Sequence, residues 1–229
     1  MNTKLLLLLG TLIFTGCAGN MLKEDPLASF HATRPASILI LPAVNESVDI
    51  MAGASVLTTL PKLLGERGYY VFPVHTVKTL LEMEGLYEAE QIHNQPTETL
   101  ADLFSADAIL YITVHSWTAR YVLIQTTTEI DLEYRITNRI GETIYQQREQ
   151  LHYTSDNSQS GNSLVNQLIS SAISAAIERA APQYIPLTRE ANNRAFITTR
   201  NPLPPGPYSS GYEKYYLNHE QYAQEQEKH

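Results

Sequence analysis

Cysteine and basic residues are scarce in this sequence. Cys17 is the single cysteine among 229 residues, which excludes an intramolecular disulfide and a cysteine-built zinc site within one chain. The chain has 16 Lys and Arg against 24 Asp and Glu, a formal net charge of −8. This acidic excess argues against a nucleic-acid partner, which needs cations to neutralise its phosphates, and against a polybasic membrane-binding surface.

Recognisable catalytic and cofactor motifs are missing as well. The seven histidines show no HxxxH, HExxH or HxH spacing, and the sequence has no G-x-G-x-x-G, P-loop or G-x-S-x-G pattern. Asp131 and Glu133 lie two residues apart on one strand face, as paired carboxylates of a glycosidase could. The flanking Glu129 and Arg135 favour a solvated strand face instead. We therefore predict no metal site, no cofactor and no enzymatic activity.

The apolar run at the N-terminus is too short to cross a membrane. It extends over residues 5–14 and follows Lys4. As a helix it would rise about 15 Å, half of a bilayer's hydrocarbon core. A basic residue, an apolar run and then small residues are typical of a secretory signal peptide. We predict a signal peptide over residues 1–16, cleaved between Gly16 and Cys17, and a tether over 17–36.

The segment Phe14-Thr15-Gly16-Cys17 resembles the bacterial lipobox, whose cysteine becomes the lipidated first residue of the mature protein. Two or more acyl chains together give stable membrane anchoring. Ala18 stands where an Asp would retain a lipoprotein at the inner membrane, so the resemblance implies a lipid anchor in the outer membrane, with the protein facing the periplasm. The alternative is a plain signal peptide that ends in a cysteine by chance.

The hydrophobic pattern in the middle of the chain predicts one globular α/β domain over residues 37–182. Strands are predicted at 37–44, 69–74, 108–117, 129–136 and 143–153, and helices at 52–67, 76–84, 95–104 and 162–180. The order β-α-β-α-α-β-β-β-α indicates a single mixed β-sheet of about five strands with helices packed on it. His115, inside the third strand, is predicted to lie at the edge or surface of the sheet.

Residues 183–229 have a different composition. They contain five of the twelve prolines and six of the fourteen tyrosines, and they end in a charged, Gln-rich stretch. We predict an extended C-terminal tail that contributes little to the core. Tyrosines offer large contact areas at low entropy cost, which suggests partner contacts for Tyr208, Tyr212, Tyr215 and Tyr216. The alternative is a disordered end without a partner.

Four segments together resemble a family of Gram-negative envelope lipoproteins of unknown function, whose best-known member is a meningococcal vaccine candidate. They are the lipobox at Cys17 and residues 68–74 (GYYVFPV), 106–112 (ADAILYI) and 204–208 (PPGPY). The resemblance implies a fold similar to the TolB amino-terminal domain and the CsgG periplasmic domain. It also implies a role through protein contacts, possible homo-oligomerisation, and no catalytic residues.

The main hypothesis is therefore a non-enzymatic lipoprotein that interacts with proteins in envelope assembly or secretion. The alternative is a periplasmic binding module for a small molecule or glycan, built on the aromatic residues Tyr69, Tyr111 and Trp117. A hydrolase is the least favoured hypothesis, because it would need a nucleophile within reach of a base.

Overall fold

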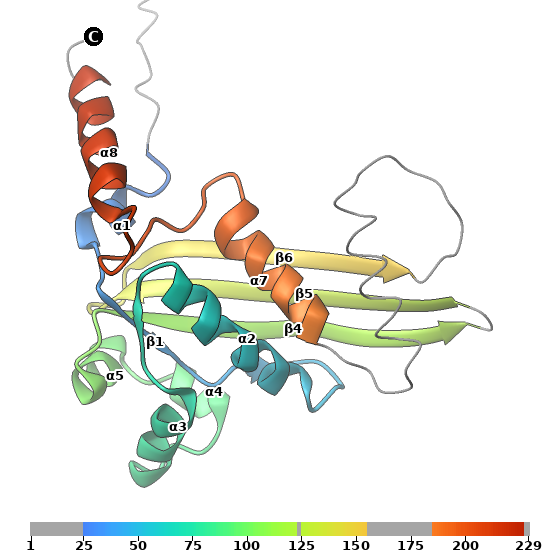
Figure 1. The fold of residues 1–229 in the computed structure, drawn as a ribbon. Coiled ribbons are helices and arrows are strands. Elements are labelled where there is room, and N and C mark those ends of the chain that lie inside the picture. Colours follow the sequence, from blue (N-terminus) through green and yellow to red (C-terminus); the bar gives the residue numbers. More distant parts are fainter. Residues whose placement is uncertain (1–24, 123–124, 155–184, 227–229) are drawn as a thin grey trace, which may run out of the picture.

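The computed structural model describes residues 25–122, 125–154 and 185–226, which form a six-stranded sheet covered by helices (Figure 1). The strands are β1 (Ser37–Ile40), β2 (Val44–Asn45), β3 (Tyr70–Val71), β4 (Ala108–Val122), β5 (Gln125–Asn138) and β6 (Thr143–Thr154). The helical elements are α1 (Ala28–Thr33), α2 (Ala52–Glu66), α3 (Val74–Met83), α4 (Ala89–His93), α5 (Thr97–Phe104), α7 (Ile185–Asn193), the π-helical turn η1 (Arg194–Thr198) and α8 (Tyr212–Gln226).

The sheet is mixed, as predicted. Its strand order is β3-β1-β4-β5-β6, and the short β2 pairs with β4 beyond the end of β1. Pairs among β1, β2, β3 and β4 are parallel, whereas β5 pairs antiparallel with both β4 and β6. The first half of the sheet is thus built through helical crossovers and the second half as a meander. The two-residue β2 is the strand that sequence analysis missed.

Apolar and charged residues alternate along β5, and they place one face of the strand in the core and the other towards solvent, as predicted. Ile130, Leu132, Tyr134 and Ile136 are at most 1% exposed and belong to the main core cluster. The intervening charged residues lie on the opposite, wetter face of the sheet. Gly141, with a φ of +86°, supplies the left-handed backbone of the turn into β6.

Two hydrophobic clusters lie on opposite faces of the sheet, because successive strand residues point to opposite sides. Ile38 and Ile40 of β1 pack in the larger cluster, which includes residues of α1, α2, α7 and η1. Leu39 of β1 and Ile109 of β4 pack in the smaller one, which is covered by α3, α4 and α5. In Figure 1, α2 and α7 cross one face of the sheet and α3 lies away from them.

The prediction that residues 183–229 form an extended tail is wrong for the part that the structure describes. Residues 185–226 contain α7, η1 and α8, and several of their side chains are buried in the main core. These core residues are Leu187, Ala191, Ala195, Phe196 and Leu203. The first three recur every four residues, the spacing of one helical face, which the Pro- and Tyr-rich composition concealed.

The predicted boundary between tether and domain also differs. Phe30, inside the predicted tether 17–36, is fully buried, and its ring meets those of Tyr69 and Tyr145 edge-on. The globular unit thus begins before residue 37 and extends past residue 182. The predicted helix 162–180, the signal peptide 1–16 and Cys17 lie outside the described residues.

Candidate functional site

The segment that follows η1 docks on the turn between α2 and β3. The Tyr69 hydroxyl donates a hydrogen bond to the backbone oxygen of Pro204 at 2.6 Å. The backbone N–H of Tyr208 donates to the oxygen of Gly68 at 3.0 Å. Two of the segments singled out in the sequence, 68–74 and 204–208, therefore bind each other. This docking places α8 next to the start of the described chain.

Helix α8 lies beside α1 in space, although the two are near opposite ends of the sequence (Figure 1). Tyr216 is only 4% exposed, and the guanidinium carbon of Arg34 lies 4.3 Å from the centre of its ring. Arg34 also forms a 2.7 Å ion pair with Glu220 of α8. Of the tyrosines predicted to contact a partner, Tyr216 is thus buried against its own chain. Tyr212 and Tyr215 are half-buried, and Tyr208 is exposed.

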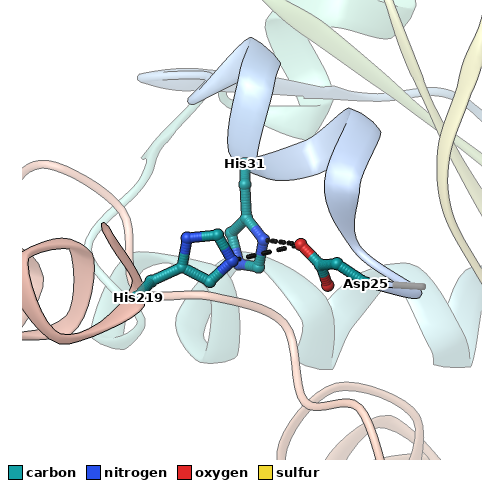
Figure 2. Close-up of side chains that lie close together, drawn as sticks. All are labelled: Asp25, His31 and His219. Atoms are coloured by element: carbon teal, nitrogen blue, oxygen red, sulfur yellow. Dashed lines mark hydrogen bonds and ion pairs between the residues drawn. The ribbon is translucent and has the colours of Figure 1, made fainter. Parts of the chain in front are cut away.

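Between these two helices, Asp25, His31 and His219 gather around one point (Figure 2). One carboxylate oxygen of Asp25, Oδ2, lies 2.6 Å from His31 Nδ1 and 3.1 Å from His219 Nε2. The second ring nitrogen of His31, Nε2, lies 2.9 Å from the hydroxyl oxygen of Tyr215. One potential ligand atom from each of the three residues lies within 4.8 Å of the others. The cluster therefore has the composition of a metal-binding group.

The electrostatics of this cluster favour a neutral imidazole beside a carboxylate. Burial lowers the pKa of His31 below its ordinary value and outweighs the opposing effect of Asp25. Burial raises the pKa of Asp25, but hydrogen bonds from the Leu27 backbone, His31 and His219 outweigh it, so this pKa is lowered overall. Our prediction of no metal site rested on local spacing, and Asp25 and His219 are 194 residues apart. No sequence motif could have joined them.

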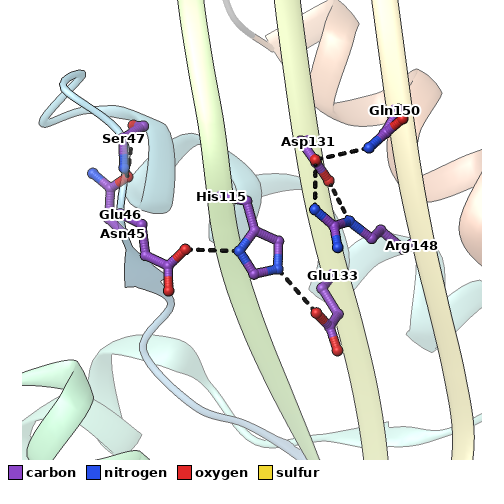
Figure 3. Close-up of polar contacts among 8 residues, drawn as sticks. All are labelled: Asn45, Glu46, Ser47, His115, Asp131, Glu133, Arg148 and Gln150. Carbon is purple, nitrogen blue, oxygen red and sulfur yellow. Dashed lines mark hydrogen bonds and ion pairs between the residues drawn. The ribbon is translucent and has the colours of Figure 1, made fainter.

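A second polar group lies on the exposed face of the sheet (Figure 3). His115 Nδ1 lies 2.7 Å from a carboxylate oxygen of Glu46, and its Nε2 lies 2.9 Å from one of Glu133. Hydrogen bonds, first that to Glu133, raise the pKa of His115, although burial opposes them. Asp131 instead receives two 2.8 Å hydrogen bonds from Arg148. Asp131 and Glu133 thus have separate partners on a solvated face, as the flanking residues predicted.

The aromatic residues proposed for a ligand site are core residues. Tyr69, Tyr111 and Trp117 are 4%, 4% and 1% exposed. Tyr69 and Trp117 belong to the cluster under α2 and α7, whereas Tyr111 lies in the cluster on the other face. The three rings therefore do not line one pocket.

A depression of about 470 Å³ does lie between α2 and α7. Its lining is mostly polar and comprises Thr58, Thr59, Lys62, Leu63, Glu66, Arg67, Arg189, Asn192, Asn193 and Ile197. Three of these side chains are basic and one is acidic, so the depression is suited to an anionic molecule more than to an apolar one.

Comparison with known proteins identifies the family. The sequence profile of the GNA1162-like family, described as "Putative lipoprotein GNA1162-like", matches residues 26–208, which is most of the chain. The chain belongs to this family. A curated relative, "Putative lipoprotein NMB1124/NMB1162" of Neisseria meningitidis serogroup B, is 33% identical over 162 residues, covering 70% of this chain and 75% of the relative.

The solved structure of a family member agrees on the fold. The crystal structure of lipoprotein GNA1162 from N. meningitidis is 32% identical, with a TM-score of 0.53, covering 63% of this chain and 99% of that one. The PelC dodecamer of Paraburkholderia phytofirmans is more distant, at 13% identity and a TM-score of 0.38, covering 68% of this chain and 89% of that one. The family match and the GNA1162 structure confirm the resemblance noted in the sequence and the mixed α/β fold. Cys17 precedes the matched span, so its lipidation stays a prediction.

Within residues 25–122, 125–154 and 185–226, no helix is both long enough and apolar enough to cross a membrane.

Proposed function

We propose that this member of the GNA1162-like family is a lipid-anchored outer-membrane protein that faces the periplasm and acts without catalysis. Its role is to bind another protein in envelope assembly or secretion. The family description as a lipoprotein and the lipobox at Cys17 support membrane anchoring. Cys17 precedes Asp25 by eight residues, a stretch of at most about 28 Å, which would keep the domain close to the bilayer.

The observation that carries the interaction role is an exposed apolar loop between β2 and α2. Val48 and Ile50 are each 90% exposed, and Met51 is 59% exposed. Grouped aliphatic side chains in contact with water are costly for an isolated domain and mark contact surfaces. The loop flanks the polar group around His115, because Glu46 contacts that histidine. It thus offers an apolar centre beside a polar rim, as protein interfaces do.

The position of this loop suits contact with a partner away from the membrane. Helix α2 begins at Ala52, directly after the loop. Its first turn lies at the end of the helix that is remote from α1 and α8 (Figure 1). The predicted anchor joins the described chain at Asp25, just before α1. The loop would therefore project into the periplasm while the other end of the domain stays near the lipid.

Photo-crosslinking in intact cells tests this proposal. A photoreactive amino acid at Ile50 of the full-length chain should give a discrete protein adduct. The same amino acid at Ile140, which is 64% exposed in the turn between β5 and β6, should give none. The adduct should disappear in Cys17→Ala. A ladder of self-adducts from position 50 would identify a second copy as the partner. Equal labelling at positions 50 and 140, or none at position 50 in a folded protein, would contradict the proposal.

A small-molecule binding module is the second candidate, and the polar depression between α2 and α7 is the feature that favours it. An anionic metabolite that raises the melting temperature of the protein, with the rise lost in Lys62→Ala, would support it.

A further inference from the structure

Asp25, His31 and His219 bring one potential ligand atom each to within 4.8 Å of one another. We propose that these three residues bind a divalent transition-metal ion such as Zn²⁺, with water completing the coordination. Neither the lipobox nor the family match implies this site, and it does not depend on the interaction role proposed above.

The distances in the cluster are close to those that zinc requires. With bonds of about 2.0–2.1 Å to nitrogen and oxygen, tetrahedral geometry separates ligand atoms by about 3.3 Å. Asp25 Oδ2 lies 2.6 Å from His31 Nδ1 and 3.1 Å from His219 Nε2. Lengthening the first separation by about 0.7 Å and the second by about 0.2 Å would therefore convert the two hydrogen bonds into two edges of a coordination sphere. Figure 2 shows both imidazole rings facing this oxygen.

Outer contacts already orient two of the three ligands. When His31 ligates through Nδ1, its proton resides on Nε2 and is donated to the Tyr215 hydroxyl, which lies 2.9 Å away. The second carboxylate oxygen of Asp25, Oδ1, accepts a 2.9 Å hydrogen bond from the Leu27 backbone, which leaves Oδ2 aimed at the histidines. Such supporting hydrogen bonds fix the tautomer and ring orientation of metal ligands.

The donor set also selects the class of metal. Two imidazoles and one carboxylate suit zinc and neighbouring transition metals, whereas Mg²⁺ and Ca²⁺ prefer all-oxygen sites. Arg34, a cation at the contact between α1 and α8, forms an ion pair with Glu220 at 2.7 Å, which offsets its charge. The Asp25 carboxylate therefore remains available to a divalent ion.

A bound ion would connect distant parts of the chain. Asp25 is the first described residue and follows the predicted anchor, whereas His219 lies in the middle of α8. Their joint coordination would tie the C-terminal helix to the membrane-proximal end of the domain. Metal binding would thus stabilise the α1–α8 junction in particular, rather than the sheet.

The test uses the full chain without a histidine tag, stripped with a chelator and titrated with ZnCl₂ in a calorimeter. We expect one ion per chain, and Co²⁺ should give the visible absorption bands of a four-coordinate site. His219→Ala should weaken zinc binding at least 100-fold. Tyr215→Phe, which keeps all three ligands, should weaken it about 10-fold. His75→Ala, which removes an exposed histidine of α3, is the matched control and should bind as the wild type does.

A second variant separates metal binding from hydrogen bonding. His219→Gln can still donate a hydrogen bond to Asp25 but cannot replace an imidazole ligand. In the wild type, zinc should raise the melting temperature and slow hydrogen exchange in α8, and both effects should vanish in His219→Gln. Failure of the wild type to bind zinc, or full binding by folded His219→Gln, would overturn the proposal and leave a hydrogen-bonded cluster only.

Discussion

Gly68 and Gly206 touch backbone to backbone, so that neither position has room for a side chain. A Cβ atom on Gly206 would overlap the carbonyl group of Gly68, and one on Gly68 would overlap the backbone of Ser209. Gly68 also has a φ of +94°, in the left-handed region that disfavours side chains. This contact is the point where the 204–208 segment docks on the α2–β3 turn.

The close contact predicts that Gly206→Ala destabilises the protein by about 3 kcal/mol, the upper end of ordinary overpacking, because rigid backbone must move. The measurement is the free energy of unfolding in urea. Gly65→Ala in α2 is the matched control, because a Cβ there meets nothing within 4 Å. Alanine stabilises a helix by roughly 0.5–1 kcal/mol relative to glycine, so this variant should be no less stable than the wild type. Equal stability of the Gly206→Ala variant and wild type would show that the segment does not dock as described.

Phe196 provides a second test, since it lies in the region predicted from sequence to be an extended tail. It is fully buried, its ring stacks on Tyr145 with centroids 5.7 Å apart, and it meets Tyr134 edge-on at 5.1 Å. Phe196→Ala should lower the free energy of unfolding by about 3–5 kcal/mol, the range for a deleted core aromatic. Leu217→Ala in α8, where the leucine is 56% exposed, should change it by less than about 0.5 kcal/mol. Similar small losses in both variants would contradict the assignment of η1 to the core.

Strand β5 and the C-terminal region together show which parts of the fold were predictable from sequence. The alternation from Glu129 to Ile136 is a local pattern, and it correctly predicted which side of β5 faces the core. The burial of Phe196 depends on its packing against Tyr134 and Tyr145, more than 50 residues earlier in the chain. Composition alone predicted an extended tail there, because it registers prolines and tyrosines but not the contacts they make.

The candidate metal-binding cluster was unpredictable for the same physical reason. His31 and Asp25 lie in a segment that resembled a tether, and His219 lies in one that resembled a tail. Their meeting requires α8 to fold back against α1, which local spacing does not encode. The position of His115 on the surface of the sheet was foreseen, but its pairing with Glu46 depends on β2, a two-residue strand with no sequence signature.

A buried chain of hydrogen bonds joins β5, α7 and α2 and gives a third prediction. The Tyr134 hydroxyl donates to Asn192 Oδ1 at 2.6 Å, and Asn192 Nδ2 donates to Thr59 Oγ1 at 2.7 Å. Tyr134→Phe leaves the buried Asn192 oxygen without this donor and should cost about 1–3 kcal/mol of stability in urea unfolding. Tyr222→Phe, at a position that is 54% exposed, is the control and should be neutral. A neutral Tyr134→Phe would mean that α7 does not pack on the sheet in this way.

The polar group around His115 makes stability depend on pH. Hydrogen bonding to Glu133 raises the pKa of His115 above 6.5, so its stabilising contribution is complete below pH 6.5 and is lost as pH rises through the folded-state value. Hydrogen bonding to His115 lowers the pKa of Glu133 below 4.5, so its contribution is complete above pH 4.5 and is lost as pH falls through the folded-state value. The combined contribution is therefore largest between pH 4.5 and 6.5.

His115→Gln should accordingly lower the melting temperature most between pH 4.5 and 6.5 and progressively less as the pH rises above that window. The loss should correspond to about 1 kcal/mol or less, because the carboxylates are partly solvated. His152→Gln is the matched control: this strand histidine is 64% exposed and lies 3.9 Å from Glu129, so its removal should have little effect at any pH. Thermal unfolding across the pH range and an NMR titration of His115 give the two readouts. A titration midpoint below 6.5, or a stability loss that grows as the pH rises, would show that Glu46 and Glu133 do not hold this imidazole in its charged form.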